Sequence, residues 1–144
     1  MSLIGQADTP ASYVAAYMQA CVGMFGIPAG GFTAEIEDFG AATGWNVDSL
    51  YSALLNSTIG RSIYTPGASN TTLATKLVDK LGGSLLSSAT RAAVIDWGKS
   101  LLDGGDSLAQ VAKGFVEAVA QFSTTDTDYG AVAQQFANRI EIAN

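Results

Sequence analysis

The sequence predicts an all-α fold of about seven helices, arranged as a single domain over residues 1–144. Three observations lead to this prediction. Apolar residues recur every three or four positions in successive segments, and no segment keeps the period-two alternation of a half-buried strand. Residues that favour helix N-caps precede many of these segments, and glycines follow several of them. Hydrophobic residues make up 48% of the chain, which is enough to build a core in a domain of this length.

The first predicted helix has a clear beginning. Thr9 is a suitable cap, and Pro10 suits the first helical position because its fixed φ matches the helix. Apolar side chains then follow at helical spacing as far as Val22. Gly23 and Gly26 are expected to end this helix.

Two more helices are predicted in the first half of the chain. One covers residues 33–43 and ends before Gly44. The other begins near Asp48 and carries leucines at helical spacing. Residues 60–67, which include Pro66, are predicted to form a loop.

The second half contains four predicted helices. Their expected starts are Asn70 or Thr71, Ser87 or Ser88, Asp106, and a position near Asp128. Glycine pairs at residues 82–83 and 104–105 are expected to end the first two of these helices.

The predicted helices show signs of an internal duplication. The apolar residues of the first helix correspond to those of the helix after Asn70 at an offset of about 59 residues, and Asp38-Phe39-Gly40 corresponds to Asp96-Trp97-Gly98. Helical periodicity alone produces part of such a match. The pattern predicts two stacked three-helix units, roughly residues 9–67 and 70–130, followed by a C-terminal helix.

Charge and hydropathy exclude two classes of partner. The chain has 13 acidic and 7 basic residues, and this net charge of −6 argues against a nucleic acid partner because phosphate would be repelled. No run approaches the roughly 18 apolar residues of a membrane span. The first residues lack a basic stretch, so any export signal is expected outside this segment.

The residue inventory also argues against catalysis. The chain has no histidine, so it has no imidazole to act as a general base or metal ligand. Its one cysteine, Cys21, cannot form an internal disulfide, and its place in an apolar helical pattern predicts buried packing. Gly98-Lys99-Ser100 lacks the upstream glycine of a phosphate loop and is expected on a helix surface. We therefore expect no catalytic residues.

Two short acidic segments are candidate calcium sites. Asp103 and Asp106 flank a pair of glycines, and Asp126 and Asp128 flank a threonine. Each pair can supply two carboxylates to a hard cation, with backbone carbonyls as further ligands. Helix capping explains Asp106 and Asp128 without any ion and is the favoured interpretation, with calcium binding as the alternative.

Aromatic residues in predicted loops are candidate glycan contacts. Trp45 and Tyr64 are placed by loops, where an exposed ring can stack on a sugar. Trp97 lies beside Ile95 in a predicted helix and is expected in the core.

The segment from residue 73 to residue 144 resembles the helical repeats of bacterial S-layer proteins and type I-secreted RTX adhesins. The stretches that carry this resemblance are Leu77-Val78-Asp79-Lys80-Leu81-Gly82, Ile95-Asp96-Trp97, Gly104-Gly105-Asp106-Ser107-Leu108, Val111–Glu117 and Phe136–Ala143. The loop at 84–89 departs from the family pattern, because it lacks the usual proline and aspartate.

The resemblance implies an extracellular or cell-surface protein. It leads us to expect a non-catalytic structural or adhesive module that contacts surface polysaccharide or neighbouring surface-protein subunits. One alternative is a calcium-stabilised spacer with no ligand of its own. Another is an accessory domain of a secreted enzyme.

Overall fold

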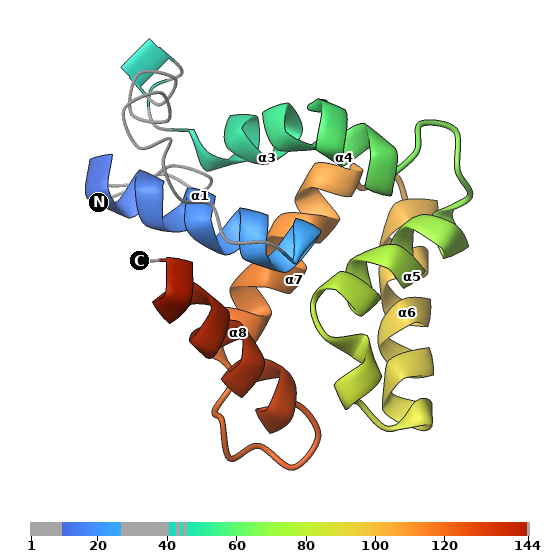
Figure 1. The fold of residues 1–144 in the computed structure, drawn as a ribbon. Helices are drawn as coiled ribbons and strands as arrows, with labels where there is room; N and C mark the ends of the chain where they lie inside the picture. The colour runs from blue at the N-terminus through green and yellow to red at the C-terminus, as the bar shows by residue number, and fades with distance from the viewer. Residues whose placement is uncertain (1–9, 27–40, 43, 45, 144) are drawn as a thin grey trace.

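The computed structural model describes residues 10–26, 41–42, 44 and 46–143 (Figure 1). Within these ranges it contains seven α-helices, one short 3₁₀-helix and no β-strand, so the all-α prediction is confirmed. The elements are α1 (Pro10–Phe25), α3 (Val47–Leu55), α4 (Thr58–Ile63), α5 (Asn70–Lys80), η1 (Gly83–Leu85), α6 (Ser88–Asp103), α7 (Leu108–Gln121) and α8 (Gly130–Ala143).

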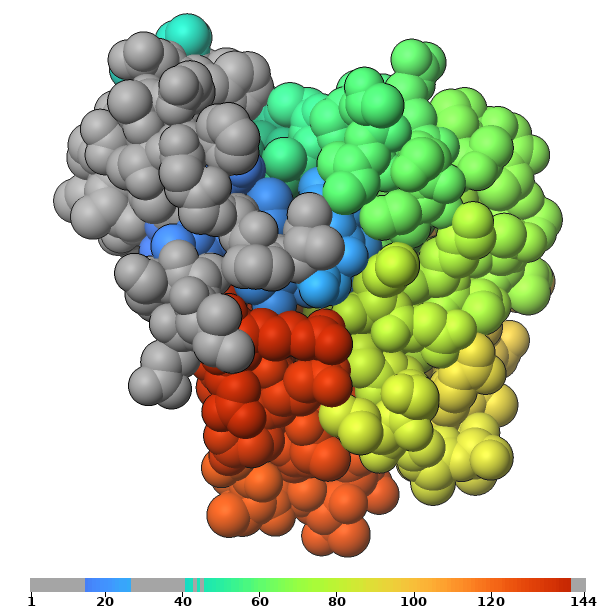
Figure 2. Space-filling model, viewed as in Figure 1, coloured from blue at the N-terminus to red at the C-terminus, as the bar shows by residue number. Residues whose placement is uncertain are grey.

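The helices are arranged around α1 and α7. Helix α7 packs against α1, α3, α6 and α8, while α5 and α6 form a hairpin at one side (Figure 1). Figure 2 shows α8 and the end of the α5–α6 hairpin side by side on the face in view, where α8 contacts η1. None of the helices in the described ranges is both long enough and apolar enough to cross a bilayer.

The second half of α1 lies at the centre of the core. Five of its last six residues are buried hydrophobic side chains, and these are Ala20, Cys21, Val22, Met24 and Phe25. They pack with the buried face of α7, which consists of Val111, Ala112, Phe115, Val116 and Val119. This contact holds α1 and α7 together, and the other helices cover its sides.

The helix beginnings are set by short polar side chains. Each of five caps accepts a hydrogen bond from a backbone N–H three residues later, and these caps are Asn46, Ser57, Ser69, Ser87 and Ser107. The expected caps Asn70 and Asp106 are wrong by one residue, because Ser69 and Ser107 hold the extended backbone of the capping position. Gln110 completes a capping box with Ser107, because the Gln110 side-chain oxygen accepts a hydrogen bond from the backbone N–H of Ser107.

Two glycines in the first half were expected to mark helix ends or loops, and both expectations are wrong. Helix α1 continues through Gly23 to Phe25, and α4 occupies part of the expected loop at 60–67. A Cβ on Gly23 would lie 2.6 Å from the Val116 side chain, and a Cβ on Gly60 would overlap the Leu54 carbonyl oxygen. Each of these glycines allows two helices to approach closely. Local sequence rules do not detect this role, because they treat a glycine as a helix breaker.

Two other sequence predictions fall partly outside the described residues. The helix predicted at 33–43 lies almost entirely there, with only residues 41 and 42 described as helical. The duplication would pair α1 with α5 and α3 with α7, and both pairs are in contact. Asp38-Phe39-Gly40, which should match Asp96-Trp97-Gly98 in α6, is not among the described residues, so the duplication stays a prediction.

The expectation that Cys21 is buried is confirmed, since its side chain is 4% exposed. Burial raises the pKa of its thiol to about 11, and a hydrogen bond from the Tyr17 hydroxyl partly offsets this effect. The thiol is therefore neutral in the folded protein at pH 7, and its role is packing.

The two interior glycines of α1 and α7 predict opposite effects of alanine. Gly23→Ala should lower the free energy of unfolding by about 1–2 kcal/mol, because overpacking against Val116 outweighs the helix propensity of alanine. Gly114→Ala, in a helix position with no atom near the new Cβ, should raise it by about 0.5–1 kcal/mol. Urea unfolding of the two variants checks this. Equal free energies of unfolding for Gly23→Ala and Gly114→Ala would contradict the close approach of α1 and α7 at Gly23.

The raised pKa of Cys21 predicts a loss of stability at high pH. The thiol ionises near pH 9 in the unfolded chain and near pH 11 in the folded protein. The stability that folding gains from the neutral thiol is therefore complete below pH 9 and is lost as the pH rises towards 11. Between pH 8 and pH 10 the wild type should lose about 1.3 kcal/mol more than Cys21→Ala in urea unfolding. Equal losses in the two proteins would show that the thiol does not change its environment on folding.

Candidate functional site

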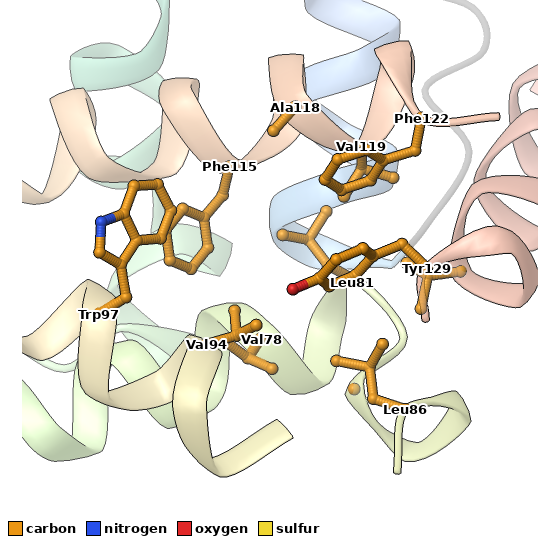
Figure 3. Close-up of a pocket in the computed structure, with 12 residues that line it drawn as sticks. Val78, Leu81, Leu86, Val94, Trp97, Phe115, Ala118, Val119, Phe122 and Tyr129 are labelled. Atoms are coloured by element: carbon orange, nitrogen blue, oxygen red, sulfur yellow. The ribbon is translucent and has the colours of Figure 1, made fainter. Parts of the chain in front are cut away.

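An apolar groove of about 110 Å³ lies between the α5–α6 hairpin and the helices α7 and α8 (Figure 3). Its lining residues are Val78, Leu81, Gly83, Leu86, Val94, Trp97, Phe115, Ala118, Val119, Phe122, Tyr129 and Val132. Most of these side chains are aliphatic or aromatic and have no polar atom. The groove opens to solvent, because Trp97 at its edge is 52% exposed.

Two stacked aromatic pairs form opposite sides of the groove (Figure 3). Trp97 of α6 stacks on Phe115 of α7 with ring centroids 4.9 Å apart and an interplanar angle of 5°. Phe122, at the end of α7, stacks on Tyr129 at 4.6 Å and 13°. Stacking fixes the orientation of all four rings before anything enters the groove.

Gly98 brings α6 close enough for the first aromatic pair to form. A Cβ at this position would lie 3.0 Å from the Phe115 ring and 3.4 Å from Ala74 of α5. The absence of a side chain lets α6 rest on Phe115, and the neighbouring Trp97 then lies flat against the same ring.

The second pair depends on the turn between α7 and α8. One carboxylate oxygen of Asp126 accepts hydrogen bonds from the backbone N–H groups of Asp128 and Tyr129, each at 2.9 Å. The Asp126 carbonyl also accepts from the backbone N–H of Gly130 at 2.9 Å. Such a turn positions Tyr129 at the start of α8, with its ring against Phe122.

An ion pair joins the two helices of the hairpin near the groove. The Arg91 guanidinium donates to both carboxylate oxygens of Asp79, each at 2.9 Å. The hydrogen bond to Asp79 raises the pKa of Arg91, so the cation is retained at any ordinary pH. This bidentate geometry orients α6 relative to α5, although solvent exposure limits its contribution to stability.

The expectation that Trp97 lies in the core is wrong. The indole covers Phe115 with one face, and half of its surface is exposed to solvent. Helical spacing showed that this residue is near an apolar face of α6, but the α5 side of the helix is where the core lies. Trp97 lies at the margin of that face, beside the groove.

The expectation that Tyr64 is exposed for glycan contact is also wrong. Its side chain is 4% exposed, and its hydroxyl donates a hydrogen bond of 2.6 Å to the carbonyl of Met24. The ring closes the core where α4 ends against α1, so it is not accessible to a sugar. Trp45, the other candidate glycan contact, lies outside the described residues.

The candidate calcium ligands have separate local roles. Asp103 accepts from Asn70 at 2.8 Å and from Lys99 at 2.6 Å, and these two hydrogen bonds lower its pKa. Asp126 stabilises the turn before α8, and all four of these aspartates are exposed. Over the described part of the chain, no three acidic, cysteine or histidine side chains gather as a metal site would require. Calcium binding stays a prediction.

The geometry of the groove suits binding of an apolar group. Its walls offer dispersion contacts to a side chain or ring of modest size, and burying such a group stabilises a complex by about 1.5–3 kcal/mol. No local sequence pattern indicates this site, because its residues come from five elements.

Comparison with known proteins adds no relative to this description. No family model, no curated protein and no solved structure matches the chain. The likeness to S-layer and RTX repeats therefore rests on the sequence stretches between residues 77 and 143 alone.

Proposed function

We propose that this chain is a non-catalytic structural module of a secreted bacterial surface protein, and that its groove takes an apolar side chain from a neighbouring protein subunit. The observation that carries the proposal is the preformed groove with two stacked aromatic walls. The resemblance to S-layer and RTX repeats supports the extracellular location.

The chemistry of the groove favours a protein side chain over a sugar. A sugar ring carries several hydroxyl groups, and each needs a hydrogen-bond partner when it leaves water. The groove walls are mostly aliphatic and aromatic and offer few such partners. A polysaccharide would therefore lose hydrogen bonds on entering, whereas a leucine or aromatic side chain would lose none.

The surface beside the groove is also apolar. Three large hydrophobic residues of the described chain are strongly exposed, and these are Ile59, Leu85 and Trp97. Trp97 lines the groove, and Leu85 lies in η1 between the lining residues Gly83 and Leu86. A partner that buries both residues around a filled groove would form the apolar centre of an interface.

Toluene is a suitable probe because it has the size of an aromatic side chain and the groove is open to solvent, so the ring need not fit entirely within its 110 Å³. We expect toluene to shift the backbone NMR signals of the groove residues Val94, Val119 and Phe122 selectively. Ala118→Leu fills the groove and should abolish these shifts.

Ala120→Leu provides the matched control for this experiment. Ala120 lies on the same helix, is exposed and does not line the groove, so the variant should bind toluene as the wild type does. Absence of groove shifts in the wild type near toluene saturation would refute the proposed function. Equal binding by Ala118→Leu and Ala120→Leu would place the binding elsewhere.

A further inference from the structure

One polar atom is directed into the groove. Two of the lining side chains carry a polar atom, namely Trp97 and Tyr129. Figure 3 shows the indole nitrogen of Trp97 on the side of the ring away from the groove. The Tyr129 hydroxyl instead points towards the centre of the groove, in the direction of the Trp97–Phe115 pair.

The Tyr129 hydroxyl is held in place but makes no hydrogen bond to any residue in the described part of the chain. Its ring is fixed by the stack on Phe122, and its backbone N–H is fixed by the Asp126 carboxylate. A purely apolar occupant that covers this hydroxyl would leave it without a hydrogen-bond partner, which weakens binding, whereas an occupant with a hydroxyl of its own would supply one.

We infer that the groove selects a tyrosine side chain, presented by a segment of the partner protein, over phenylalanine or leucine. The inference rests on the proposed function, because it names the side chain that the groove would take. A tyrosine ring supplies the apolar body that the two aromatic pairs accept. Its hydroxyl either donates to or accepts from the Tyr129 hydroxyl, since each group can do both.

The charges of the turn that carries Tyr129 indicate which residues should flank this tyrosine. The turn from residue 123 to residue 129 contains Asp126 and Asp128 and no basic residue. The nearby Arg91 is neutralised by its ion pair with Asp79. A segment with lysine or arginine next to the tyrosine complements these aspartates, whereas an acidic segment is repelled.

The experiment compares acetyl-Lys-Tyr-Lys-amide with acetyl-Lys-Phe-Lys-amide by NMR titration of the whole chain. The tyrosine peptide should bind about three- to tenfold more tightly, which is the range expected for one hydrogen bond to a hydroxyl. Tyr129→Phe should reduce this ratio to about one and should bind the phenylalanine peptide more tightly than the wild type does. Acetyl-Glu-Tyr-Glu-amide should bind less tightly than the lysine peptide, and added salt should narrow that difference.

The outcomes separate this inference from the proposed function. Equal affinities of the two lysine peptides for the wild type, with toluene still shifting the groove signals, would overturn the selection of tyrosine and leave the groove as an apolar site. A ratio that persists in Tyr129→Phe would also overturn it. If neither toluene nor any peptide shifts the groove signals, the proposed function fails with the inference. Tyr129→Phe removes a hydroxyl without a described partner, so its spectrum should otherwise match the wild type.

Discussion

The contact between α1 and α7 at Gly23 is the constraint on which the rest of the structure depends. At this point the α1 backbone meets the Val116 side chain so closely that a methyl group has no room. The buried half of α1 and the apolar face of α7 therefore form one continuous contact. Helices α3, α5 and α8 each contact α1 and close around it, and Tyr64 ties the end of α4 to the Met24 carbonyl.

The groove follows from how α6 is attached to this centre. Helix α6 packs extensively on α5 but meets α7 only over a short contact, where Gly98 rests on Phe115. Past that contact the α5–α6 hairpin and α7 diverge, and aromatic side chains fill only part of the space between them. A bulkier residue than glycine at position 98 would move α6 away from Phe115 and disturb the Trp97–Phe115 stack.

Sequence patterns showed where the helices lie along the chain, but not which helices pack against one another. Apolar spacing and glycine pairs predicted the helices of the second half closely, because those signals act within a few residues. Gly23 and Gly60 gave misleading signals, since a glycine that permits close packing looks the same in sequence as one that ends a helix. Tyr64 was expected in an exposed loop, but it follows directly on α4 and its ring is buried. Trp97 was misplaced for a different reason. Periodicity shows which residues share a helix face, but not which other helix covers that face.

The site itself could not be predicted from local sequence, because its two aromatic pairs join α6 to α7 and the end of α7 to the turn before α8. These pairs favour binding because their rings are already ordered before a partner binds. A ring that is already stacked loses little conformational freedom when a partner binds, so more of the apolar contact energy remains as affinity. The Asp126 turn adds to this order by holding Tyr129 through backbone hydrogen bonds. An aspartate that looked like a metal ligand in the sequence thus shapes an apolar site in the structure.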